Sequence, residues 1–319
     1  MITDYIRKVG RGKTLAKDLT GPEARDAFSQ LLEGRFTPAQ AGAFLQALRI
    51  KELSLEELDG LTHVFSQGKI FSSPPPGLTL NLASDTPRKG GYASLLAARC
   101  LAQSGLSVGV VRSEPVLSRN MESWEGTWRA IGSVGPENLH VVHANELLPA
   151  LQGLESIRGE LGFRSCLHTA EKLINPWSNW PVVMGISHRH YAERMAENLR
   201  NRGLRGKIVL GNHGTPDLAL HKETEIWEVL ADGNIRTLLI NPTDFGLHTD
   251  PVVYTLGFLP EWPKEWVKPG AGALGPVLRY HLAFQRYAAG QVPDPASGMA
   301  GLDEMLDGHL HSMSGNESL

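Results

Sequence analysis

The sequence changes its pattern near residue 73, and this change constrains the fold more than any other feature. Residues 72–77 (SSPPPG) break all periodicity, as a linker does, because proline and glycine interrupt helices and strands alike. Before this run, apolar residues recur at helical spacing, and after it short apolar runs alternate with helical stretches. The pattern therefore predicts a helical domain over residues 1–70 and an α/β domain over residues 71–319.

The first 66 residues contain three helix starts and no strand pattern. Thr20 is followed by Glu23, and Ser54 by Glu57, a spacing that lets each pair of side chains cap the backbone at a helix start. Thr37, followed by proline, begins the helix between them. The apolar face of this middle helix consists of Ala41, Phe44, Leu45 and Leu48. A helical unit this short needs another surface against which to bury such a face.

The rest of the chain is typical of an α/β fold. The expected strands are residues 78–82, 107–111, 141–142, 182–184 and 208–210, and the expected helices between them include residues 95–103 and 191–201. Strands that alternate with helices predict a mainly parallel central sheet with helices on its faces.

Composition is that of a folded protein outside the membrane. Hydrophobic residues make up 41% and charged residues 20% of the chain, and no apolar run reaches the ~20 residues of a membrane-spanning helix. Residues 1–17 lack the hydrophobic core of a signal peptide. The two cysteines, Cys100 and Cys166, lie far apart in apolar stretches, which favours buried, inert thiols in a reducing compartment. We expect a cytoplasmic protein.

The charge is unevenly distributed along the chain. The net charge is -3, yet no Lys or Arg follows Arg286. The chain after that residue carries the acids Asp294, Asp303, Glu304, Asp307 and Glu317. Without these five acids, 31 basic residues face 29 acidic ones, and the basic residues cluster at 7–17 and 188–207. Such clusters bind phosphate in some proteins and form a solvated helix face in others.

Short motifs in the chain do not identify a catalytic site by themselves. Residues 10–14 (GRGKT) look like the end of a phosphate-binding loop, but position 7 is arginine rather than glycine and no strand precedes it. His188 and His190 are two residues apart and would not share a helix face. We expect no metal site, because no cluster of ligand residues has suitable spacing.

Several segments in the same order resemble the anthranilate phosphoribosyltransferase family, glycosyltransferase family 3. In the helical part the resemblance lies in residues 36–51 (FTPAQAGAFLQALRIK). In the large part, residues 161–164 (LGFR) and 175–176 (NP) resemble the family's LGxR and NP segments, and residues 241–247 (NPTDFGL) its PEDFGL turn. The resemblance implies a helical domain and an α/β domain with the active site in the cleft between them. It also implies a homodimer through the helices, to which we assign the apolar face around Phe44 and Leu48.

The residues that would hold the activated sugar phosphate in that family are missing. Its glycine-rich GTGGD loop aligns with residues 83–91 (ASDTPRKGG), where Pro87 lacks an N–H and Arg88 and Lys89 replace small residues. The family's acid pair for magnesium aligns with Ala219 and Leu220, which cannot bind a hard cation. We therefore expect no magnesium cofactor and no transfer to anthranilate.

Other positions of the family's cleft keep polar side chains. The NIST segment retains Ser94, and the KHGN segment aligns near Arg112 without its lysine. Asp217 and Glu223 lie within a few residues of the lost acid pair in the sequence, so a shifted alignment could bring one of them to its position. The residual cleft is expected to contain Ser94, Arg112, Arg164, His168 and His213.

Three functions stay open from the sequence. Residues 10–13, 47–51 and 162–173 are similar to a degenerate subgroup of the family, whose members are described as dimers that bind nucleic acid without sequence preference. The first function is therefore non-catalytic DNA or RNA binding through phosphate contacts. The contacts would come from Lys13, Lys17, Arg88, Lys89, Arg189, Arg194, Arg202 and Arg205. The second is a glycosyltransferase, either a phosphoribosyltransferase or a phosphorylase, acting on an aromatic or base substrate. The third is a remnant with a binding role only.

Overall fold

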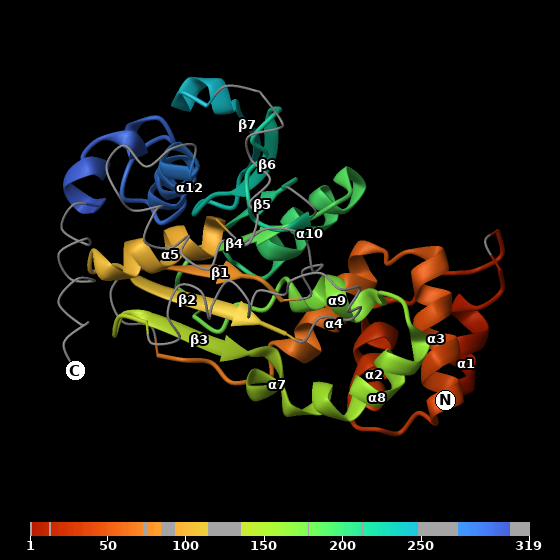
Figure 1. Ribbon diagram of the computed structural model, residues 1–319. Helices are drawn as coiled ribbons and strands as arrows, with labels where there is room; N and C mark the ends of the chain where they lie inside the picture. The colour runs from red at the N-terminus through yellow and green to blue at the C-terminus, as the bar shows by residue number, and fades with distance from the viewer. Residues whose placement is uncertain are drawn as a thin grey trace.

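Four helices stand beside a seven-stranded sheet in the computed structural model (Figure 1). The structure describes residues 2–12, 14–72, 76–83, 93–113, 135–177, 179–211, 214–247 and 274–306. Within these ranges, no helix is long and apolar enough to cross a membrane.

Three of the four N-terminal helices start where the sequence pattern predicts, and the first helix was not predicted. The four are α1 (Ile2–Val9), α2 (Gly21–Leu32), α3 (Pro38–Lys51) and α4 (Leu55–Phe65). The side chains of Thr20, Thr37 and Ser54 each accept a hydrogen bond from the backbone N–H three residues on, and the side chain at that position returns one. These reciprocal bonds satisfy N–H groups that a helix start otherwise leaves unpaired.

The sheet confirms the predicted α/β class with mainly parallel strands. Its strands are β1 (Gly77–Asn81), β2 (Ser107–Arg112), β3 (Leu139–His143), β4 (Val182–Gly185), β5 (Gly206–Val209), β6 (Thr224–Val229) and β7 (Ile235–Ile240). They lie in the order β3-β2-β1-β4-β5-β6-β7, with parallel pairing from β3 to β5 and antiparallel pairing from β5 to β7.

The antiparallel hairpin of β6 and β7 was not predicted, although its signals are present. The two strands are joined through Asp232 and Gly233, and Gly233 has a φ of 80°. An Asp-Gly pair between alternating apolar segments is a strong hairpin signal. The fifth strand also begins two residues earlier than expected, at Gly206, where it pairs with Val182 on one side and Val229 on the other.

Helices cover the sheet on both faces. The helices after the linker include α5 (Ala93–Gln103), α7 (Ala144–Leu147), α8 (Glu155–Leu161), α9 (Cys166–Glu171), α10 (Arg189–Asn201) and α12 (Leu274–Ala288), with short 3-10 turns at Pro149–Leu154, Pro242–Phe245 and Ser297–Met299. α5 and α12 pack together on one face of the sheet, whereas α9 and α10 join the four N-terminal helices on the other (Figure 1).

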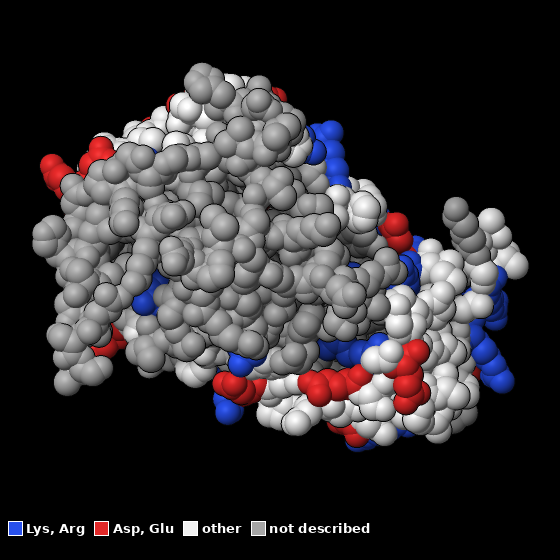
Figure 2. All heavy atoms as spheres, in the orientation of Figure 1, with Lys and Arg blue, Asp and Glu red and all other residues white. Residues whose placement is uncertain are grey.

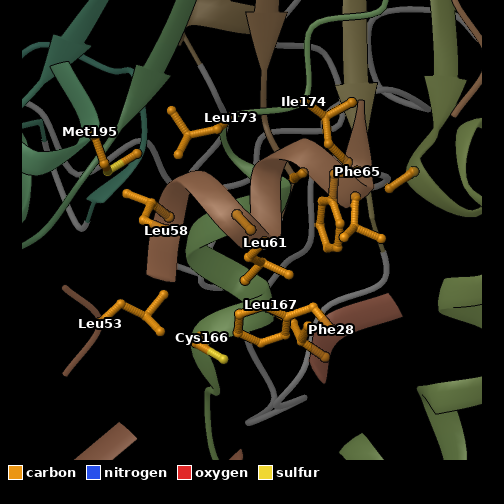
Figure 3. Packing of buried hydrophobic residues seen from close by; sticks show 14 of the residues in the cluster. Phe28, Leu53, Leu58, Leu61, Phe65, Cys166, Leu167, Leu173, Ile174 and Met195 are labelled. Carbon is orange, nitrogen blue, oxygen red and sulfur yellow. The ribbon is translucent and has the colours of Figure 1, made fainter. Parts of the chain in front are cut away.

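One continuous apolar core joins the helical part to the α/β part. Figure 3 shows Leu58 and Leu61 of α4 among Leu167 of α9 and Met195 of α10. Phe44 and Leu48 of α3 are also fully buried within this single chain. The apolar face that we assigned to a dimer contact is therefore buried by the chain itself, so that reasoning was wrong. The homodimer stays a prediction, as does the domain boundary at residue 70.

Both cysteines are buried, as the sequence predicts, and neither forms a disulfide. Burial raises the pKa of the Cys100 thiol to about 12, and burial with the nearby Glu57 charge raises that of Cys166 to about 12. Neither thiol is therefore reactive near neutral pH.

Candidate functional site

A cavity of about 360 Å³ lies between the helical part and the α/β part. Three separate stretches of the chain supply most of its walls: the end of α3 with the turn after it, the segment from Arg164 to α9, and the residues that follow β4 into α10. Its lining is Leu48, Arg49, Glu52, Leu53, Arg164, Ser165, Cys166, His168, Thr169, Lys172, Ile186, Ser187, His188, His190, Tyr191, Met195 and Gly214. Ligands of open α/β sheets bind beyond the carboxyl ends of parallel strands, which is where residues 186–188 lie.

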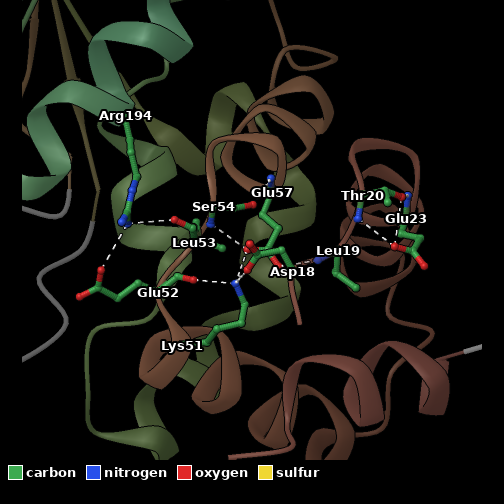
Figure 4. A network of polar contacts seen from close by, with 10 residues as sticks. All are labelled: Asp18, Leu19, Thr20, Glu23, Lys51, Glu52, Leu53, Ser54, Glu57 and Arg194. Atoms are coloured by element: carbon green, nitrogen blue, oxygen red, sulfur yellow. Dashed lines mark hydrogen bonds and ion pairs between the residues drawn. The ribbon is translucent and has the colours of Figure 1, made fainter. Parts of the chain in front are cut away.

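The turn between α3 and α4 brings one acidic side chain into the cavity. Glu52 has a φ of 65°, in the left-handed region that non-glycine residues rarely adopt. Lys51 stabilises the turn, since its Nζ donates to the Glu52 carbonyl at 2.8 Å and to the Glu57 carboxylate at 2.6 Å (Figure 4). Arg194 of α10 donates to the Leu53 carbonyl at 3.0 Å and to the Glu52 carboxylate at 3.3 Å. His190 lies 3.3 Å from the same carboxylate.

Positive side chains outnumber acidic ones in the lining. The lining contains three positive side chains, those of Arg49, Arg164 and Lys172. Glu52 is the only acid among the lining residues that the structure describes. Arg49 donates to the Arg164 carbonyl at 2.7 Å and lies over the Phe163 ring, 4.9 Å from its centroid. The Arg49 guanidinium is therefore held between the two parts of the chain by contacts that leave its charge unneutralised.

His168 lies in the wall of the cavity with only 2% of its surface exposed. The Ser165 N–H donates to Nδ1 at 2.9 Å, and Nε2 has no hydrogen-bond partner among the residues that the structure describes. Burial lowers the pKa of His168 to about 3, with the Arg158 and Arg164 charges acting in the same direction and Glu171 opposing them. His168 is therefore neutral near pH 7.

An ion pair beneath the cavity fixes the position of α9. Arg158 of α8 donates to both carboxylate oxygens of Glu171, at 2.6 and 3.1 Å, and both side chains are buried. The next residue, Lys172, is also buried, and its Nζ donates to the Gly214 carbonyl at 3.2 Å. This contact ties α9 to the segment that follows β5.

A carboxylate of the protein itself lies at the start of α5. Asp217 accepts hydrogen bonds from the N–H of Ala93 at 3.1 Å and of Ser94 at 2.9 Å, and only 4% of its surface is exposed. The N-terminus of a helix attracts anions through its unpaired N–H groups and its dipole. The Asp217 carboxylate thus occupies a position where a phosphate oxygen would otherwise bind well.

The residues at the family's magnesium position do not fit that ion. Ala219 and Leu220 are buried hydrocarbon side chains without the oxygen ligands that magnesium requires. Of the two acids considered for a shifted register, Asp217 is bound to α5 and Glu223 is exposed. Among the described residues, no group of three His, Cys, Asp or Glu could hold a metal ion.

The predicted basic contacts on and after α10 are engaged within the protein. Arg189 forms an ion pair with Glu225 at 2.8 Å, and Arg194 is bound to the turn after α3. Arg202 donates to the Leu173 carbonyl at 2.8 Å, and burial lowers its pKa to about 10 although Asp59 opposes the shift. Arg205 donates to the Asn179 carbonyl at 2.7 Å. These bonds orient the four guanidinium groups, whose role in binding stays a prediction.

The remaining predicted site residues that the structure describes lie in several separate places. Arg164 and His168 line the cavity, and their role in a residual cleft stays a prediction. Ser94 lies buried at the start of α5 and Arg112 half-buried at the end of β2, whereas Lys17 is exposed before α2. Lys13, Arg88, Lys89 and His213 lie outside the described residues.

Sequence reasoning assigned only Arg164 and His168 of the lining residues to a cleft, and the charged and aromatic side chains that it missed include Arg49, Lys172, His190 and Tyr191. Arg49 and Lys172 lie in the segments that carry the family resemblance, and this could have identified them. His190 and Tyr191 reach the cavity because α10 begins at Arg189, shortly after β4 ends at Gly185. No spacing rule in the sequence joins these positions.

Comparison with known proteins gives a consistent result over most of the chain. A model of the glycosyl transferase family helical bundle domain matches residues 3–67, and a model of the glycosyl transferase family a/b domain matches residues 129–254. The anthranilate phosphoribosyltransferase of Symbiobacterium thermophilum is 27% identical over 271 residues, which cover 79% of this chain and 76% of the relative. That of Chloroflexus aggregans is 28% identical over 77% of this chain and 76% of the relative.

Solved structures share the fold at lower identity. The anthranilate phosphoribosyltransferase of Thermus thermophilus has a TM-score of 0.77 and 22% identity, with 97% of this chain and 96% of that chain covered. The enzyme of Saccharomyces cerevisiae in complex with PRPP and Mg has a TM-score of 0.75 and 15% identity, over 98% of this chain and 95% of that chain.

Proposed function

Because the chain belongs to the glycosyl transferase family that includes the anthranilate phosphoribosyltransferases, we propose that it uses this fold to bind DNA or RNA without sequence preference and without transferase activity. The proposal assigns nucleic-acid phosphates to the cavity between the helical and α/β parts. Contacts to phosphates position a protein on nucleic acid but carry no base information. Binding should therefore be similar for different sequences.

The observation that carries the proposal is the combination of charged and aromatic side chains in the cavity. Arg49, Arg164 and Lys172 supply positive charge, and Glu52 is already engaged by Arg194 and His190. Next to them, the His190 and Tyr191 rings lie 4.5 Å apart between centroids. Proteins that bind single strands pair positive charge with aromatic rings on which bases stack.

The described outer surface of the helical part supports a site in the cleft rather than on an open basic face. On the face drawn in Figure 2, Lys and Arg are interspersed with Asp and Glu over this part and do not form one continuous basic surface. A surface of mixed charge attracts a polyanion weakly. The cavity concentrates the positive charge that this surface lacks.

The start of α5 supports the loss of transferase activity. A phosphoribosyl donor carries a diphosphate whose charge must be stabilised during transfer. Here the Asp217 carboxylate takes up the first N–H groups of α5, and a second anion beside it would be repelled. The positions of the family's acid pair are apolar, so we propose that no magnesium is used.

One observation favours the alternative, a glycosyltransferase for an aromatic or base substrate. The cavity has the size of a small-molecule pocket, and Arg164 lies in it at the LGxR position of the family resemblance. A phosphoribosyltransferase or a phosphorylase would place such a substrate against this arginine.

Two assays on the purified full-length protein separate these functions. Fluorescence anisotropy with labelled oligonucleotides of several sequences, in low salt, should give saturable binding of similar affinity for each. Incubation with phosphoribosyl diphosphate, magnesium and anthranilate or a nucleobase should give no product. Product formation without oligonucleotide binding would favour the transferase, and absence of both would leave neither function.

A further inference from the structure

Two donors lie in the cavity wall contributed by α9 and by Lys172, the residue that ends this helix. His168 and Lys172 are four residues apart, a spacing that brings side chains together on a helix surface. Both line the cavity and both are at least nine-tenths buried, with exposed fractions of 2% and 5%. We propose that His168 Nε2–H and Lys172 Nζ form a subsite for a single phosphate oxyanion. This subsite deepens the proposed nucleic-acid function and rests on it.

The hydrogen bonds of His168 determine which ring nitrogen can face a ligand. The Ser165 N–H lies 2.9 Å from Nδ1, and the Ser165 carbonyl oxygen lies 3.1 Å from the same nitrogen. Because a backbone N–H can only donate, we infer from the shorter contact that Nδ1 is proton-free. The neutral ring then carries its proton on Nε2. That N–H has no acceptor among the described residues, and a buried donor without an acceptor is costly. An oxygen of a bound phosphate supplies the missing acceptor.

The surroundings of His168 favour an anion over a cation. Among the charges near the ring, that of Glu171 has the largest effect and raises the pKa of His168, whereas the positive charges of Arg158 and Arg164 lower it. The Glu171 carboxylate is itself neutralised by two bonds from Arg158, and Arg164 adds a positive charge at the cavity wall. Arg49 is held to the Arg164 carbonyl at the same cavity. Because the ring remains neutral, it donates a hydrogen bond without adding a charge that would have to be desolvated.

Lys172 gives the subsite its charge. Its Nζ donates to the Gly214 carbonyl at 3.2 Å, which holds the ammonium group toward the segment after β5. Hydrogen bonds from a charged donor to a phosphate are stronger than neutral ones. A phosphate between Nζ and Nε2 would receive one charged and one neutral hydrogen bond.

The test measures binding of inorganic phosphate to the full-length protein by isothermal titration calorimetry at low ionic strength. Lys172→Gln removes the charge, and His168→Leu removes the donor. Each should weaken phosphate binding at least about tenfold, equivalent to about 1.4 kcal/mol. His168→Gln keeps an N–H donor and should retain more affinity than His168→Leu. Lys69→Gln makes the same change outside the cavity and should bind as the wild type does.

A second ligand separates a terminal phosphate from an internal one. A dinucleotide with a 5′-phosphate should bind more tightly than the same dinucleotide without it if the subsite takes a monoester end. Equal affinity of the two, with both weakened in Lys172→Gln, assigns the subsite to the internal diester. Wild-type protein that binds neither phosphate nor dinucleotide overturns the subsite, as does unchanged affinity in His168→Leu and Lys172→Gln.

Oligonucleotide binding by the same variants separates the subsite from the function on which it rests. Phosphate binding that depends on both residues, without oligonucleotide binding by the wild type, would keep the subsite and remove the nucleic-acid function. Oligonucleotide binding that both variants retain in full would keep the function and overturn the subsite. Thermal melting curves identify a variant that fails to fold, and His168→Gln then replaces His168→Leu as the deciding variant.

Discussion

Replacing Asp217 by alanine tests whether the start of α5 is an anion position that the protein fills with its own carboxylate. The substitution removes the acceptor of two buried backbone N–H groups, bound at 3.1 and 2.9 Å. A buried donor left without a partner costs about 1–3 kcal/mol. Two such donors give an expected loss of roughly 2–4 kcal/mol in the free energy of unfolding, after some relief from water. Asp217→Asn keeps one acceptor oxygen and should lose about half as much.

The same variant should gain an anion dependence that the wild type lacks. Phosphate that binds the N–H groups left unpaired by the substitution stabilises the folded state by mass action. Urea unfolding with and without phosphate, at constant ionic strength, should show a larger phosphate effect in Asp217→Ala than in the wild type. Glu223→Ala, which removes a nearby exposed acid, is the control and should leave both quantities unchanged. An Asp217→Ala protein as stable as the wild type would refute the reasoning.

Three further predictions follow from the buried charges and the cavity size. The pKa of His168, about 3 when folded, lies below its unfolded value of about 6.5. As pH falls from about 6.5 to about 3, His168 is protonated in the unfolded chain but not in the folded protein. The free energy of unfolding should therefore decrease over this range, by about 2 kcal/mol from pH 7 to pH 5. Urea unfolding at both pH values should show this component in the wild type but not in His168→Gln. Arg158→Ala leaves the Glu171 carboxylate buried without its bidentate partner. It should lower the free energy of unfolding, measured by urea unfolding, by about 3–5 kcal/mol. A decrease below about 1 kcal/mol would contradict the structural role of the pair. A cavity of about 360 Å³ admits a nucleotide but no duplex, so a single-stranded oligonucleotide should bind more tightly than the matching duplex in anisotropy titrations, and equal affinities would argue against binding inside the cavity.

The parts of the fold that depend on local sequence were predictable. Each capping box is contained within four residues, so Thr20, Thr37 and Ser54 identify their helix starts without tertiary information. The parallel strands follow from apolar runs that alternate with helices. The β6–β7 hairpin shows the limit of this approach, since its Asp232-Gly233 turn was visible in the sequence but was not used.

The site was less predictable because its contacts join distant parts of the chain. Arg49 meets the Arg164 carbonyl across 115 positions, and Asp217 meets the Ser94 N–H across 123 positions. Family resemblance identified Arg164 and His168 as cleft residues, and both line the cavity. Charge clustering indicated Arg202 and Arg205, but the structure directs both to backbone carbonyl groups. A run of like charges in a sequence does not reveal which members have partners in the fold.

The salt dependence of oligonucleotide binding tests the central claim most directly. The measurement compares the wild type with the triple variant Arg49→Gln, Arg164→Gln and Lys172→Gln, which removes the positive charge that lines the cavity. Each phosphate contact to a single strand contributes about 0.7 to the slope of log affinity against log salt. Three lost contacts should therefore flatten the slope by about 2, with equal weakening for every sequence tested. A triple variant that folds and retains the wild-type slope would contradict nucleic-acid binding in this cavity.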